Sequence, residues 1–124
     1  DGTDRGIRLK STRGRGGVVE DIRISNVVMR NIKNEAIVMD LMYSNTPAEP
    51  LSERTPIFRD IHVSGLTARD VKTPIFIRGL DEAPISDVSL RDINIQSREK
   101  PQFLNYKNLS LTDVTINGKT ITLE

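Results

Sequence analysis

A pattern of five apolar positions recurs four times along this chain, always with spacings of three, two, three and two residues. On a helix, at about 100° per residue, these side chains would surround the whole axis. In an extended chain, each step of two keeps the side chains on one face, and each step of three adds one residue that must turn the chain. The pattern therefore predicts strand, corner and strand. The four copies are Val19, Ile22, Ile24, Val27, Met29; Phe58, Ile61, Val63, Leu66, Ala68; Ile85, Val88, Leu90, Ile93, Ile95; and Tyr106, Leu109, Leu111, Val114, Ile116.

The residues inserted at the steps of three support this interpretation. All eight are Asp, Asn or Gly, the types that enter left-handed backbone conformations or bond their own backbone at turns most easily. We interpret the Asp residues among them as corner residues and not as a catalytic acid and base. The predicted corners are Asp21, Asn26, Asp60, Gly65, Asp87, Asp92, Asn108 and Asp113.

A further strand motif, at residues 6–10, 36–40 and 74–78, is interleaved with these units. Short strands repeating every 20 to 40 residues or so are typical of a parallel β-helix, in which each coil buries its apolar face only by stacking on its neighbours. A β-sandwich is a weaker alternative, because a hairpin signal of the Asn-Gly type occurs only at Asn117-Gly118. We therefore expect an all-β fold of about four coils, with residue 37 stacked between residues 7 and 75.

The composition agrees with a single all-β domain over residues 1–124, with residues 43–56 as an inserted loop. The chain is 36% hydrophobic, has few aromatic residues and contains no segment apolar enough to span a bilayer. It begins at Asp1, and its first expected strand follows within a few residues, which would leave an open coil edge. We interpret the chain as the C-terminal part of a longer solenoid, whose N-terminal coils are the expected partner.

Several classes of site are disfavoured. The absence of Cys excludes thiolate chemistry, and the single His, His62, lies between two core-facing residues, which predicts an ordinary outward-facing strand position. No metal or organic cofactor is expected. Residues 1–33 carry a net charge of +4 against −3 for the remainder, which favours an anionic partner. Nucleic acid is not expected, because this segment lacks stacking aromatics and a recognition helix.

Within the basic segment, Arg8 and Lys10 are the candidate binding residues. Because Ile7 and Leu9 face the core, both cations project from the outer face of one strand, about 7 Å apart. Such a pair suits a carboxylate, which Arg grips with two hydrogen bonds and Lys attracts as a point charge. A solvated strand face is the open alternative.

Tyr43 is the third candidate. Stacking the second strand motif on the first sets Val38 above Arg8 and Asp40 above Lys10, so Tyr43 follows the end of the second strand and precedes the long loop. A phenol in that position can contact a ligand on the neighbouring coil. A packing or rim tyrosine remains the alternative.

These residues carry a family resemblance. The string Gly6-Ile7-Arg8-Leu9-Lys10 resembles the Arg-Ile-Lys motif of family 28 glycoside hydrolases, the polygalacturonases, with Leu9 in place of the usual Ile. Residues 36–43 are similar to the segment in which that family carries a substrate-contacting tyrosine. Residues 13–22 are most similar to bacterial members, and the likeness covers the chain as the last coils of a right-handed parallel β-helix.

The resemblance implies inverting hydrolysis of α-1,4-linked galacturonic acid in pectin, outside the cell or in the periplasm. Arg8 and Lys10 would bind a carboxylate beside the scissile bond, and Tyr43 would contact the same sugar. The family's catalytic carboxylates belong to Asn-Thr-Asp, Asp-Asp and Gly-His-Gly motifs upstream of the Arg-Ile-Lys string, and none of these motifs occurs here. We therefore expect no catalytic residue in this chain and no activity of the chain alone. A non-catalytic carbohydrate-binding β-helix and a structural, adhesin-like β-helix remain alternatives, and endo or exo cleavage of homogalacturonan or a related pectin stays open.

Overall fold

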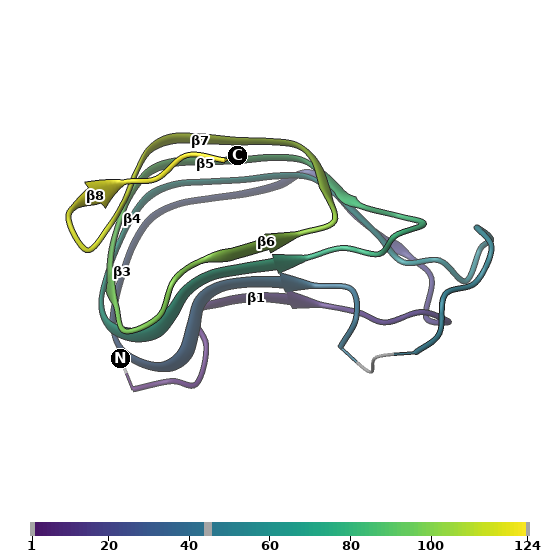
Figure 1. The fold of residues 1–124 in the computed structure, drawn as a ribbon, viewed down its shortest axis with the longest axis horizontal. Helices are drawn as coiled ribbons and strands as arrows, with labels where there is room; N and C mark the ends of the chain where they lie inside the picture. The colour runs from purple at the N-terminus through teal and green to yellow at the C-terminus, as the bar shows by residue number, and fades with distance from the viewer. Residues whose placement is uncertain (1, 44–45, 124) are drawn as a thin grey trace.

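The computed structural model describes residues 2–43 and 46–123, which wind into stacked coils (Figure 1). Successive coils pair in parallel through β1 with β3, β3 with β4, β4 with β5, and β5 with β7. The predicted parallel β-helix is therefore confirmed. The described residues form eight strands and no helix: β1 (Ile7–Lys10), β2 (Val18–Val19), β3 (Ile22–Asp40), β4 (Ile57–Arg78), β5 (Ile85–Ser97), β6 (Gln102–Leu104), β7 (Tyr106–Ile116) and β8 (Lys119–Thr120).

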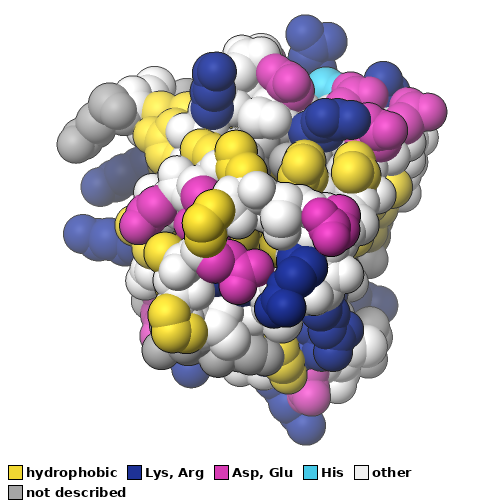
Figure 2. All heavy atoms as spheres, turned by 90° about the vertical axis from the view of Figure 1, so that its right-hand side faces the viewer, with side chains coloured by type: hydrophobic (Ala, Val, Ile, Leu, Met, Phe, Trp, Pro, Cys, Tyr) yellow, Lys and Arg dark blue, Asp and Glu magenta, His cyan; other side chains and the backbone are white. Residues whose placement is uncertain are grey.

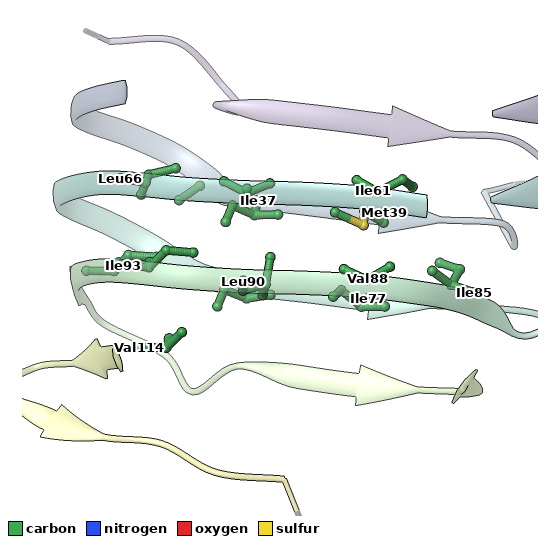
Figure 3. Packing of buried hydrophobic residues seen from close by; sticks show 14 of the residues in the cluster. Ile37, Met39, Ile61, Leu66, Ile77, Ile85, Val88, Leu90, Ile93 and Val114 are labelled. Atoms are coloured by element: carbon green, nitrogen blue, oxygen red, sulfur yellow. The ribbon is translucent and has the colours of Figure 1, made fainter. Parts of the chain in front are cut away.

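The repeated apolar positions stack in register from coil to coil. Ile22, Ile61, Val88 and Leu109 occupy one such row across four strands. Figure 3 shows side chains of successive coils meeting in one narrow core, where Ile61 is fully buried. Burial of each such aliphatic side chain stabilises the fold by about 1.5 to 3 kcal/mol. Stacking of like residues is thus the source of the solenoid's stability.

The corners lie where the sequence predicts them. All eight predicted positions have positive φ, between 53° and 69°. Further corners that were missed include Asn31, Asp70 and Asn105, with φ of 58°, 56° and 53°. All three are Asn or Asp, and the first two follow Asn26 and Gly65 by five residues each, so the same residue-type signal was present. The strands bend through these corners, so β3 and β4 are long single elements in place of the separate short strands expected.

The last strand departs from the parallel pattern. β8 pairs antiparallel with β7, through a tight turn at Asn117 and Gly118 whose φ values are 52° and 81°. Both residues are left-handed, as a two-residue hairpin of this hand requires. The lone Asn-Gly signal in the sequence is therefore a genuine hairpin, appended to the final coil.

The N-terminal face of the solenoid is less covered than its interior. Ile7 and Leu9 of β1 are half-buried, whereas their register partners Ile37 and Met39 in the next coil are fully buried. The connections between successive coils gather along one side of the solenoid, at the right of Figure 1, and Figure 2 shows acidic, basic and hydrophobic side chains intermixed on this side. The expected loop connects β3 to β4 on this side, and its residues 44–45 lie outside the described residues. None of the described residues belongs to a helix long and apolar enough to cross a membrane.

Candidate functional site

One sheet of the solenoid carries the candidate site. It consists of β1, the ends of β3 and β4, and β6, which lie side by side in Figure 1. Arg8, Val38, Phe76 and Gln102 are register neighbours across its outer face. A hollow of about 290 Å³ lies over this face, lined in part by Arg8, Lys10, Tyr43, Phe76, Glu99 and Gln102. We call this hollow the trough.

The glycine that precedes β1, Gly6, is required by close packing. A Cβ at Gly6 would lie 2.6 Å from the carbonyl oxygen of Ala36 and against the thioether of Met29. The Gly6 backbone N–H instead donates to the Glu35 carbonyl at 2.9 Å, which starts the parallel pairing of β1 with β3. Because that pairing sets the register, Arg8 and Lys10 are exposed on the trough side, as predicted.

Tyr43 lies over the two cations, so the structure brings together all three predicted residues. Lys10 Nζ lies 4.0 Å from the centroid of the Tyr43 ring, and Arg8 Cζ lies 5.6 Å from it, both within the range of cation–π attraction. The positive charge of Lys10, more than that of Arg8, lowers the pKa of the Tyr43 phenol. The three side chains thus form a compact electropositive cluster at one end of the trough.

An ion pair that sequence reasoning missed fixes the turn before Tyr43. Arg78 donates two hydrogen bonds to the Asp40 carboxylate, at 2.9 and 2.8 Å, and Asp40 also accepts from the Met42 backbone N–H at 2.9 Å. The hydrogen bond with Asp40 raises the pKa of Arg78. Tyr43 itself donates its backbone N–H to the carbonyl of Ser11 at 3.2 Å. The stacked strand motifs place Asp40 beside Arg78, so the signal for this pair was available.

The other carboxylates that line the trough have structural partners. Glu35 accepts a hydrogen bond from Arg5 at 3.0 Å, and Glu99 accepts one from the Thr73 hydroxyl at 2.6 Å. Asp40 is held by Arg78 as described above. Each of these three carboxylates is therefore engaged by a neighbouring side chain of the protein.

A second ion pair that sequence reasoning missed, between Arg13 and Glu82, connects the loops beyond the trough, and we call it the clasp. Arg13 donates to Glu82 at 2.6 and 3.0 Å and also to the carbonyl of Thr46, so it joins three separate connections. The hydrogen bond from Arg13 lowers the pKa of Glu82 to about 2. Loop residues have no repeat to align them, so no pattern in the sequence points to this contact.

The single histidine lies on a different sheet, away from the trough. His62 is half-buried and its ring contacts the Asp60 carboxylate at 2.7 Å and the Ser89 hydroxyl at 2.5 Å. The hydrogen bond with His62 lowers the pKa of Asp60. His62 faces outward from its strand, as predicted, and takes no part in the cluster around Tyr43.

Comparison with known families supplies the deciding observation: residues 1–120 match the model of the glycosyl hydrolases family 28. The chain belongs to this family. The predicted family resemblance of the chain is thereby confirmed.

Two proteins with similar sequences are named as endopolygalacturonases. The endo-polygalacturonase of Pectobacterium carotovorum subsp. carotovorum is 29% identical over 104 residues, which are 84% of this chain and 24% of that protein. Endopolygalacturonase I of Aspergillus oryzae is 30% identical over 101 residues, covering 79% of this chain and 27% of the relative. The chain thus spans about a quarter of the length of these family 28 relatives.

A solved family structure agrees with the fold. The crystal structure of a hyperthermoactive exopolygalacturonase from Thermotoga maritima superposes with a TM-score of 0.84 at 28% identity. The match covers 95% of this chain and 26% of that one. The described coils therefore correspond to one part of a family 28 solenoid.

Proposed function

We propose that this chain forms the substrate-binding coils of a polygalacturonase-like hydrolase that cleaves α-1,4-galacturonosyl linkages in pectin. The observation that carries the proposal is the cluster of Arg8, Lys10 and Tyr43 at one end of the trough. Neither cation contacts a carboxylate among the described residues, so both are available to an anionic ligand. The carboxylate of a galacturonate ring suits this pair, and Tyr43 contacts the same sugar.

We propose that the acid and base that catalyse hydrolysis lie in coils upstream of this chain. Inverting hydrolysis needs one carboxylic acid to protonate the leaving oxygen and one carboxylate, about 6.5 to 9.5 Å away, to activate water. The sequence contains no Asn-Thr-Asp, Asp-Asp or Gly-His-Gly motif, and the carboxylates of the trough are engaged in structural contacts. We therefore expect the chain alone to bind oligogalacturonate without hydrolysing it.

The upstream coils would dock on the half-buried N-terminal face, where Ile7 and Leu9 are less covered than their partners in the next coil. That docking would continue the trough past Arg8 toward the acid and base. Pectin is an extracellular polymer, so the complete enzyme is proposed to be secreted or periplasmic.

Alanine substitution of the cations tests the proposal. In the full-length enzyme, Arg8→Ala and Lys10→Ala should each lower kcat/KM on polygalacturonate by about 10- to 100-fold, because each removes a charge-assisted contact worth roughly 1.5 to 3 kcal/mol. Arg91→Ala is the matched control, since Arg91 is also exposed but lies on another sheet beside His62. Unchanged kinetics in both trough variants, with folding intact, would overturn the proposal. Uronate binding by a parent that shows no hydrolysis would favour the carbohydrate-binding alternative.

A further inference from the structure

The trough continues past the cationic cluster to an aromatic ring that the proposed carboxylate contact does not use. Phe76 is two strands away from Arg8 in the register, with Val38 between them. Parallel neighbours lie about 4.8 Å apart, so the two positions are separated by about 10 Å across the sheet. Both side chains line the same trough. Phe76 is therefore at a distance suited to another ring of the same saccharide chain.

The Phe76 ring is both available and rigidly supported. Its side chain faces outward from β4 and is only half-buried, although Phe is usually a core residue. Arg78 Cζ lies 5.2 Å from the ring centroid, and Arg78 is itself fixed by Asp40. Gln102, the next register neighbour of Phe76, lines the same trough and carries an amide. A flat apolar surface beside an amide suits the apolar face of a sugar ring.

The charge at this end of the trough differs from that around Tyr43. Arg5 and Arg78 are neutralised by Glu35 and Asp40. Glu99 is exposed, lines the trough and has the neutral Thr73 hydroxyl as its hydrogen-bond donor. Among the described residues that line the trough outside the Tyr43 cluster, Glu99 is therefore the carboxylate without an ion pair, whereas the charges of Arg8 and Lys10 are positive.

We propose that Phe76 forms the floor of a second sugar subsite, which accepts an uncharged ring while Arg8 and Lys10 hold an ionised uronate. A methyl-esterified galacturonate or a neutral sugar stacks on Phe76, and the Glu99 carboxylate repels an ionised uronate at the same position. The inference rests on the proposed function, because the cationic cluster anchors the chain. It deepens that function by naming a pectin that carries both ionised and uncharged rings as the preferred ligand.

Calorimetric titration of the chain with three trisaccharides tests this subsite. The ligands are fully ionised trigalacturonate and two forms esterified on one terminal ring, at the reducing or the non-reducing end. One esterified form should bind about 3- to 10-fold more tightly than the ionised ligand. Glu99→Gln should remove most of this preference by improving binding of the ionised form, and Phe76→Leu should weaken all three ligands by about 5-fold, since stacking on an aromatic ring is lost while apolar volume is kept.

Two control variants test whether the loss of any exposed apolar side chain or of any exposed negative charge has the same effect as a change at Phe76 or Glu99. Leu104→Ala removes a side chain that is 47% exposed on the same sheet outside the trough, and Glu53→Gln removes one exposed acidic charge from the loop. Neither should change the affinities, and circular dichroism should show native folding for every variant.

The outcomes distinguish this inference from the proposed function. Trisaccharide binding that depends on Arg8 but is indifferent to Phe76→Leu, Glu99→Gln and esterification would overturn the second subsite alone. No binding of any uronate, with Arg8→Ala indistinguishable from the unmodified chain, would overturn the proposed function and the subsite with it. Weaker binding of both esterified ligands than of the ionised one would also reject an uncharged subsite.

Discussion

The clasp between Arg13 and Glu82 should make the stability of this protein depend on pH in a defined acidic range. The side chains are 6% and 13% exposed, and Glu82 accepts two hydrogen bonds from the guanidinium. The pKa of Glu82 falls from 4.5 to about 2 in the folded protein. Because the folded pKa is the lower one, the stabilisation is complete above pH 4.5 and is lost as the pH falls toward 2.

The magnitude follows from the shift. Each pKa unit corresponds to about 1.4 kcal/mol, so the full shift is worth about 3 kcal/mol. The pair lies among surface loops and not in the core, and solvent screening reduces this to about 2 kcal/mol. Glu82→Gln removes the titrating group, so the difference in unfolding free energy between the unmodified protein and this variant isolates the clasp from every other carboxylate.

Urea unfolding between pH 7 and pH 2 measures that difference. It should be about 2 kcal/mol at pH 7 and shrink toward zero near pH 2. Glu20→Gln is the control, because Glu20 pairs with Arg59 through side chains that are 50% and 46% exposed. Exposed pairs contribute about 0 to 1 kcal/mol. A Glu82→Gln difference that stays constant over the whole pH range would refute the reasoning.

Three further predictions concern the core, the corners and the trough. Ile61→Ala should lower the free energy of unfolding by about 2 to 5 kcal/mol, because Ile61 is fully buried, whereas Val28→Ala at a 76% exposed position should change it by less than about 0.5 kcal/mol in the same urea titration. Asp92→Ala should cost about 1 to 2 kcal/mol because φ is 55° there, while Asp92→Gly should be nearly neutral in thermal unfolding; equal losses would argue against backbone strain. Asp40→Asn should weaken trigalacturonate binding about 5-fold by loosening the turn before Tyr43, and calorimetry showing native affinity would exclude that positioning role.

Much of the fold could be predicted because it repeats. The apolar spacing and the Asp, Asn or Gly residue before each turn recur in every coil, so the same local signal is present several times and each copy supports the others. The stacking of Val38 on Arg8 and of Asp40 on Lys10 followed directly from aligning the strand motifs, and the register confirms it. The same alignment contained the Asp40 and Arg78 pair, which went unrecognised because charged residues on an outer face are usually solvated.

The residues between strands could not be placed in this way. Arg13, Thr46 and Glu82 come from three connections of different length, and their contact depends on how each loop folds along the side of the solenoid. Likewise, the half-exposed Phe76 was part of an aligned strand motif, but its place in the trough depends on Glu99 and Gln102 from the following coil.

By itself the sequence indicated the stacking of this protein, since the period of its apolar residues favours bent parallel strands that bury them, and left-handed corners are most favourable at residues such as Asp, Asn and Gly. Tertiary structure alone decided how charge is distributed in the trough. Whether a cation is free for a ligand or neutralised by a neighbour depends on distances of a few ångströms between coils, because ion pairing falls off steeply with separation and exposure. Arg8 and Arg78 illustrate the difference, since both occupy the outer face of a matching strand motif but only Arg78 meets a carboxylate.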